Sequence, residues 1–181
     1  EMYTAYFNRA ADAEGLYFWA DKLAEGMSLN TIAEYFFDQE ETRGIYTDPS
    51  DTNAFVTAVY ANVLGRTPDQ AGFDFWQQQV ATGSVSQGAF VLEVIGGAKA
   101  GGNAADVAYL SNKANLGVYF SAIQGMSDVD DARAVFSVFG DAATSNLAGA
   151  RAAIDTHYAD ATAAGAGDFL FPLVGVVDDP F

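Results

Sequence analysis

An internal repeat with an offset of 57 residues constrains the fold of this chain more than any other sequence feature. A segment that starts at Tyr3 aligns without a gap with one that starts at Tyr60, and the alignment pairs both tryptophans of the chain. Its clearest matches are Tyr3 with Tyr60, Phe7 with Leu64, Arg9 with Arg66, Asp12 with Asp69, Gly15 with Gly72, Phe18 with Phe75, Trp19 with Trp76 and Gly26 with Gly83. Self-similarity of this kind indicates one supersecondary unit used twice, so we expect two equivalent units packed side by side.

Each copy is predicted to be a series of short helices joined by tight turns. Asp12 and Asp69 precede an apolar pattern of helical period, which predicts them as N-caps whose carboxylates accept backbone amides of the next helix. Gly26 and Gly83 follow that pattern and are predicted to end the helix in a left-handed conformation. The caps therefore set equivalent helix boundaries in the two copies.

The tryptophans and arginines of the repeat are interpreted as structural. Trp19 and Trp76 share a helical face with apolar neighbours, and this phase predicts both as buried core anchors; stacking on sugar rings is the alternative. Arg9 and Arg66 stand three residues before the capping aspartates, and we expect each arginine to brace the loop at its corner. A functional corner is the alternative interpretation.

The whole chain is predicted to be all-α, with tandem helical repeats packed as a bundle, extra C-terminal helices and an extended C-terminal tail. The repeats occupy residues 1–103, as units 1–46 and 51–98. Helices over 104–164 are expected to pack on the repeats, and an extended apolar tail follows over 165–181.

Within this layout, the first helix of the first copy is expected to be truncated at Glu1, because the chain begins in the middle of the pattern. The glycine-rich segment 96–103 is predicted to be a flexible connector. One long helix is expected over 104–124, with Val107, Leu110, Ala114 and Val118 on its apolar stripe, and a last helix over 146–164.

Composition removes several classes of function. The chain has 24 acidic and 8 basic residues, a net charge of −16, which disfavours nucleic acid and anionic membranes as partners. It has no cysteine, so disulfides, thiolate metal sites and cysteine nucleophiles are excluded. No apolar run approaches the length of a membrane span. His157 is the single histidine, and it is interpreted as an exposed partner of Asp160 rather than a catalytic base.

The acidic surplus is interpreted first as a solvating surface, with calcium as the alternative and the one candidate cofactor. The candidate calcium ligands are Asp48, Asp51 and Asn53, which lie in a loop that Pro49 stiffens. An additional apolar cluster near the C-terminus is too apolar for a free end and is predicted to be an assembly arm or to fold back over the helices. It consists of Phe169, Leu170, Phe171, Leu173, Val174, Val176 and Val177.

The motif Arg-x-x-Asp-x-x-Gly-x-x-Phe-Trp, followed by glycine seven residues after the tryptophan, resembles the DUF4214 repeat family. Both copies match it, at residues 9–19 and 66–76, and the resemblance extends over about residues 1–122. It implies a domain of large secreted bacterial proteins, found beside calcium-binding repeats and in surface-layer-like proteins exported by type I secretion. The family is also distantly similar to phycobilisome linker domains, which are assembly proteins.

Together these features favour a non-enzymatic extracellular module for structure or assembly, which associates with itself or with other subunits at the bacterial surface. A module that binds glycan or lipopolysaccharide and anchors a protein to the cell surface is the alternative. A glycan hydrolase that uses a carboxylate pair is a third, because a pair brought together by the fold cannot be seen in the sequence.

Overall fold

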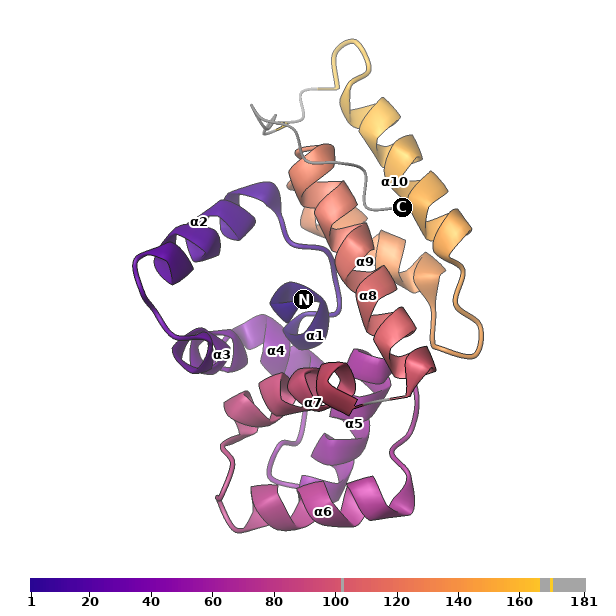
Figure 1. The fold of residues 1–181 in the computed structure, drawn as a ribbon. Helices are drawn as coiled ribbons and strands as arrows, with labels where there is room; N and C mark the ends of the chain where they lie inside the picture. Colours follow the sequence, from indigo (N-terminus) through magenta and orange to yellow (C-terminus); the bar gives the residue numbers. More distant parts are fainter. Residues whose placement is uncertain (102, 167–169, 171–181) are drawn as a thin grey trace.

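The fold, seen in a computed structural model, is described for residues 1–101, 103–166 and 170 (Figure 1). All regular secondary structure in these residues is helical, which confirms the all-α prediction. The elements are α1 (Met2–Tyr6), α2 (Ala13–Ala24), α3 (Leu29–Phe37), α4 (Glu40–Ile45), α5 (Thr52–Leu64), α6 (Gln70–Ala81), α7 (Gln87–Gly101), α8 (Ala104–Val118), the π-helical turn η1 (Tyr119–Ile123), α9 (Val129–Phe139) and α10 (Leu147–Ala161).

The predicted caps are present in both copies of the repeat. The Asp12 carboxylate accepts the Gly15 amide at 2.7 Å and begins α2, and the Asp69 carboxylate accepts the Gly72 amide at 2.8 Å and begins α6. Gly26 and Gly83 have φ of 98° and 70°, the left-handed conformation that ends these helices. Three helices of the first copy, α1 to α3, thus correspond to α5 to α7 of the second.

One predicted boundary is wrong, and one predicted helix changes type near its end. The segment 96–103 is not a connector, because α7 continues to Gly101. Glycine weakens a helix by about 1 kcal/mol per residue relative to alanine, but Val94, Ile95 and Ala98 are buried in the core and hold this last part of α7 in place. The long helix expected over 104–124 is present to Ile123, but it is α-helical only to Val118 and then widens into the π-helical turn η1, where the Gln124 amide donates to the Tyr119 carbonyl.

The core consists of two apolar clusters, and α8 contributes to both. The first lies among the helices of the two repeats and includes Leu110 of α8. The second lies among α8, η1, α9 and α10 and includes Tyr109 and Leu116. Figure 1 shows α8 running diagonally between the repeat helices and the pair α9–α10, which pack on each other.

The buried face of α8 differs from the predicted stripe. Val107 is exposed, whereas Asp106, Tyr109 and Lys113 are buried. The helix is covered on two sides, by repeat helices and by the C-terminal helices, so a single apolar stripe does not describe it.

The C-terminal tail lies mostly outside the described residues, and this includes Phe169, Phe171, Leu173, Val174, Val176 and Val177 of the predicted assembly cluster. Leu170 is described, and its half-buried side chain packs against the second apolar cluster. Among the described helices, none is long and apolar enough to span a membrane.

Candidate functional site

Each repeat contains a polar corner between its first two helices, and the motif residues meet there. In the first corner, Arg9 donates through Nη1 to the Ala10 carbonyl at 2.9 Å and to Asp12 Oδ1 at 3.1 Å. Its Nε and Nη2 donate to both carboxylate oxygens of Glu41 on α4, at 2.9 and 3.1 Å. The guanidinium also lies over the Tyr3 ring, 5.2 Å from its centroid. Arg9 therefore braces the loop as expected, and it is buried with its charge fully paired.

The second corner is similar, but its arginine pairs with an acid of α8 instead of with the capping aspartate and an acid of α4. Arg66 donates through Nη1 to the Thr67 carbonyl at 3.0 Å, and through Nε and Nη2 to Asp106 of α8 at 2.6 and 2.7 Å. The Tyr60 ring again lies under the guanidinium, at 5.6 Å. Asp106 is buried, so this ion pair attaches α8 to the second repeat.

The glycine of the motif has a packing role in both corners. A methyl group on Gly15 would lie 2.1 Å from the Tyr3 hydroxyl oxygen and 2.5 Å from Asp12 Oδ2. At Gly72 the equivalent distances are 3.1 Å to the Tyr60 hydroxyl oxygen and 3.2 Å to Asp69 Oδ1. The tyrosine hydroxyl and the capping carboxylate occupy the space that a side chain would need, which explains the glycine.

Sequence reasoning missed the acids that pair with the two arginines. Glu41 and Asp106 are 32 and 40 residues away from their partners, and no local pattern links them. Glu41 also accepts from Arg133 of α9 at 2.7 Å. Burial acts to raise the pKa of Glu41, but hydrogen bonds from Arg9 and Arg133 hold the pKa of this carboxyl below its usual value.

The tryptophans hold equivalent positions, but the expectation that they are buried core anchors is wrong. Both are half-buried. Trp19 packs on Phe36 and Trp76 on Phe90, each with ring centroids 5.1 Å apart. Each indole therefore packs against the first apolar cluster while part of its surface stays exposed.

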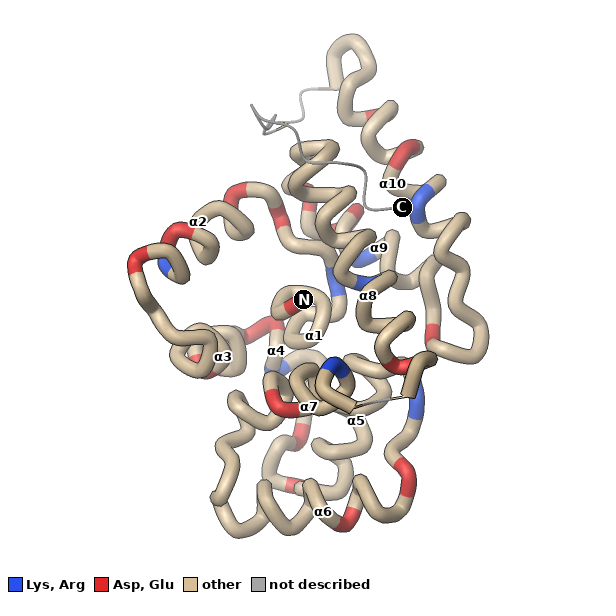
Figure 2. Tube along the Cα trace, in the orientation of Figure 1, with Lys and Arg blue, Asp and Glu red and all other residues tan. Residues whose placement is uncertain are grey.

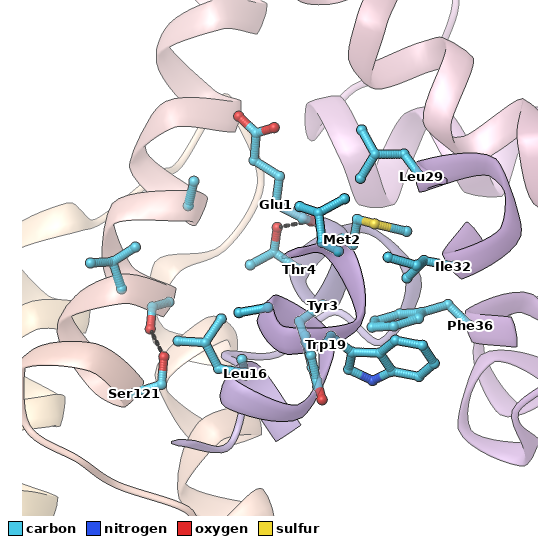
Figure 3. A pocket seen from close by; sticks show the side chains of 16 residues that line it. Glu1, Met2, Tyr3, Thr4, Leu16, Trp19, Leu29, Ile32, Phe36 and Ser121 are labelled. Atoms are coloured by element: carbon cyan, nitrogen blue, oxygen red, sulfur yellow. Dashed lines mark hydrogen bonds between the residues drawn. The ribbon is translucent and has the colours of Figure 1, made fainter. Parts of the chain in front are cut away.

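An apolar groove opens beside Trp19, with a cavity volume of about 430 Å³ (Figure 3). It lies between α1, α2 and α3 on one side and α8 with η1 on the other, and its apolar lining includes Met2, Leu16, Trp19, Leu29, Ile32 and Phe36. This volume falls within the range of ligand clefts, about 300–1,000 Å³. We refer to it as the α2 groove.

A second cavity, of about 420 Å³, lies beside a buried lysine that sequence reasoning also missed. Lys113 is 1% exposed, and its ammonium donates to Asn8 Oδ1 at 2.8 Å, the Asn62 carbonyl at 2.7 Å and Asn62 Oδ1 at 3.2 Å. These acceptors are amide and carbonyl oxygens, and burial lowers the pKa of Lys113 to about 7. The available signal was a lysine three residues from both Leu110 and Leu116, on the buried face of α8.

The candidate calcium ligands lie in an exposed loop with other roles. Asp51 is the N-cap of α5, and its Oδ1 accepts the amides of Asn53 and Ala54 at 3.0 and 3.1 Å. Hydrogen bonds from Ser50 and from the Asp51 amide lower the pKa of Asp48. In the described part of the chain, no three Asp, Glu or His side chains gather as a ligand set. Calcium binding stays a prediction.

His157 pairs with a different acid from the one expected. Its Nδ1 lies 2.8 Å from Asp131 Oδ1 on α9, rather than beside Asp160. The contact joins α10 to α9 and is only partly buried. A tertiary contact thus replaces the local pair that the helical spacing suggested.

Comparison with known proteins gives one match. Residues 33–98 match a family described as a domain of unknown function, DUF4214. The matched range begins in α3 and ends in α7, so it contains the second copy of the motif and not the first. No curated protein and no solved structure matches the chain.

Proposed function

From the premise that residues 33–98 of this chain form a DUF4214 domain, we propose that the chain is a non-enzymatic assembly module of a secreted or surface-layer-like bacterial protein. It associates with copies of itself or with other subunits of that assembly. The family carries no defined chemistry, so the proposal depends on what the surface of the domain offers a partner.

The observation that carries the proposal is apolar surface left uncovered on the outer helices of the first repeat. Leu23 at the end of α2 and Leu29 at the start of α3 are about half exposed, and both line the α2 groove. Phe18 and Tyr35 on the same two helices are also exposed. Contiguous exposed apolar surface is typical of protein interaction sites.

The polar groups of the two corners support a structural role over catalysis. The guanidinium groups of Arg9 and Arg66 are held in bidentate pairs with carboxylates. A hydrolase acid needs a raised pKa, whereas Glu41, Asp48 and Asp141, three described carboxyl groups whose pKa departs from its usual value, are all shifted downward.

The charge of the chain supports an exterior location. Acidic positions are spread over outer helices, among them α2, α6 and α10 (Figure 2), and the net charge is −16. Such a surface keeps a protein soluble at high salt and repels nucleic acid. Export by type I secretion and binding of calcium belong to the same proposal, on the basis of the family resemblance.

Sedimentation velocity over a range of protein concentrations tests the assembly role. We expect self-association that Leu23→Glu removes. Val138→Glu is the matched control, because Val138 is similarly exposed on α9, away from the α2 groove, and the substitution adds the same charge. A wild-type chain that stays monomeric at high concentration in salt and calcium, or equal loss of association in both variants, would contradict self-association through this surface.

A run of aromatic side chains favours the glycan-binding alternative. Phe18 and Tyr35 are exposed and lie close to Trp19, whose ring centroid is 5.1 Å from that of Phe18 and 6.0 Å from that of Tyr35. Exposed aromatic faces of this kind can stack on sugar rings. Retarded migration of the chain in gels that contain lipopolysaccharide, lost in Tyr35→Ala and retained in Leu23→Glu, would support this function instead.

A further inference from the structure

The buried amine of Lys113 lies at the wall of the second cavity, whose volume is about 420 Å³. Its hydrogen bonds end on Asn8 and Asn62, and it lies over the rings of Tyr109 and Phe136, 5.8 and 5.4 Å from their centroids. These four residues line the cavity together with Lys113, which is itself 1% exposed. The amine is therefore removed from bulk solvent but lies where a small molecule in the cavity would meet it.

Lys113 is neutral far more often than an ordinary lysine, and only a neutral amine attacks a carbonyl carbon. A lysine with the usual pKa of 10.5 is neutral in about one molecule in 3,000 at pH 7. Burial lowers the pKa of Lys113 to about 7, so about half of the molecules hold it neutral at that pH. The neutral amine keeps two N–H bonds for the oxygens of Asn8 and Asn62 and has a lone pair for reaction. A lysine desolvated in this way is an activated nucleophile of the kind that forms Schiff bases.

The charges around the cavity favour a neutral ligand. Among the described residues that line it, Tyr109 and Asp141 are the other titratable groups. Burial raises the pKa of Tyr109 to about 12, and its neutral hydroxyl donates to the Gly140 carbonyl at 2.9 Å. The Asp141 carboxylate accepts from the amides of Ala143 and Thr144 at 3.0 and 2.9 Å, and hydrogen bonds of this kind lower its pKa. A charged carboxylate at the cavity, in a chain of net charge −16, disfavours an anionic ligand.

We propose that this cavity captures a small neutral aldehyde, which Lys113 holds as a Schiff base. The amine nitrogen attacks the carbonyl carbon and forms the C–N bond. The nitrogen gives up its two protons, and the carbonyl oxygen leaves with them as water, so the reaction needs no oxidant or reductant and is reversed by hydrolysis. The site shares no lining residue with the α2 groove, so it is independent of the proposed assembly function.

The cavity suits a short aliphatic aldehyde in size and lining. Its volume is near the lower end of the range for ligand clefts, about 300–1,000 Å³, which leaves room for a chain of a few carbon atoms. The apolar part of the aldehyde lies against the apolar lining, which consists of Ile45, Ala58, Ala61, Phe136 and Phe139. The protonated imine keeps one N–H for the oxygens of Asn8 and Asn62. Because both residues line the cavity, water that enters it satisfies the oxygen atoms that lose their donor.

Reductive alkylation of the folded chain with propanal tests the proposal. Cyanoborohydride reduces each imine to a stable secondary amine, and peptide mapping by mass spectrometry then gives the rate at each lysine. The chain has three lysines, and Lys22 and Lys99 are internal references because both form ion pairs at the surface. At pH 7 we expect Lys113 to be modified at least tenfold faster than either reference, despite its burial. Modification of Lys113 no faster than that of Lys22 and Lys99 would overturn the inference.

The folded structure should be the source of this preference. In urea that unfolds the chain, the three lysines should react at similar rates, because the lowered pKa of Lys113 depends on burial. In the folded chain, the rate at Lys113 should level off above about pH 8, whereas the rates at Lys22 and Lys99 should continue to rise towards their higher pKa. A preference for Lys113 that persists in urea would contradict a site formed by the fold.

A pair of variants on α9 tests entry through the cavity. Ser137 is exposed and lines the cavity, so Ser137→Trp should fill part of it and slow modification of Lys113 at least fivefold. Val138→Trp is the matched control, because Val138 is also exposed but is not part of the lining. Circular dichroism and the unchanged rates at Lys22 and Lys99 establish that both variants are folded. Equal rates at Lys113 in the two variants would refute capture of the aldehyde in this cavity.

Discussion

Replacement of Lys113 by methionine tests how much the buried ammonium group lowers the free energy of unfolding. The lysine lies between the two repeats, and it donates its three hydrogen bonds to oxygens of Asn8 and Asn62 rather than to a carboxylate. Asn8, at φ of 47°, and Gly65, at φ of 66°, hold equivalent left-handed positions after the first helix of each repeat. The ammonium therefore lies near the C-terminal ends of α1 and α5, where helix dipoles favour a cation, but burial opposes its charge.

The sign of the pH dependence follows from the direction of this shift. Burial lowers the pKa of Lys113 from 10.5 to about 7. Between these values the unfolded chain binds the proton and the folded chain does not, so the free energy of unfolding rises with pH. One pKa unit corresponds to about 1.36 kcal/mol, and the rise from pH 7 to pH 9.5 is about 3 kcal/mol. Below pH 7 both states are protonated, and the destabilisation by the buried charge is fully present.

Urea unfolding followed by far-ultraviolet circular dichroism, at fixed ionic strength between pH 7 and 9.5, measures this rise. Lys113→Met should remove most of it, and Lys99→Met is the matched control because Lys99 is exposed in its pair with Glu1. Burial is the main cause of the lowered pKa of the Glu1 amino group, and it acts in the same direction in every variant. Burial raises the pKa of tyrosines such as Tyr109 to about 12, so their ionisation favours the unfolded chain only above pH 10. The pH range of the experiment therefore ends below that value. An equal slope in wild type and Lys113→Met would refute the reasoning.

Three further outcomes are expected. Gly15→Ala should destabilise the fold by about 1–3 kcal/mol through overpacking. Gly72→Ala should cost less, because its added methyl group would lie 3.1 Å from the tyrosine hydroxyl oxygen, whereas the distance at Gly15 is 2.1 Å. Thermal denaturation that ranks the two variants in reverse order would contradict the corner geometry. Asp106→Asn should lower the free energy of unfolding by about 2–3 kcal/mol, since it weakens the bidentate pair with Arg66; an unchanged urea midpoint would show that the pair does not hold α8. Asp51→Ala should cost about 1 kcal/mol as a lost N-cap, with and without calcium, whereas a calcium-specific rise in the thermal midpoint of the wild type that this variant lacks would establish a calcium site in the loop.

Sequence alone determined the features that depend on neighbouring residues. The caps at Asp12 and Asp69 bind amides three residues away, and the left-handed glycines at Gly26 and Gly83 follow from backbone sterics. Each of these interactions is complete within one turn of chain. The repeat then showed that the same local arrangement occurs twice, and the caps and the arginine–tyrosine contacts recur in both corners.

Tertiary structure decided what surrounds each local unit. The acids that pair with Arg9 and Arg66 come from α4 and α8, and no spacing rule relates them to the motif. The helical state of residues 96–101 likewise depends on burial of Ile95 and Ala98 against other helices, which outweighs the weak helix propensity of glycine.

The difference between the two copies is also a tertiary property. Leu23 and Val80 hold equivalent positions in the repeat, yet Leu23 is 48% exposed whereas Val80 is 9% exposed. A periodic pattern identifies the apolar face of a helix, against which another element can pack. Whether another element covers it depends on the packing of segments distant in the chain, and for this reason the groove beside α2 became visible only in the folded structure.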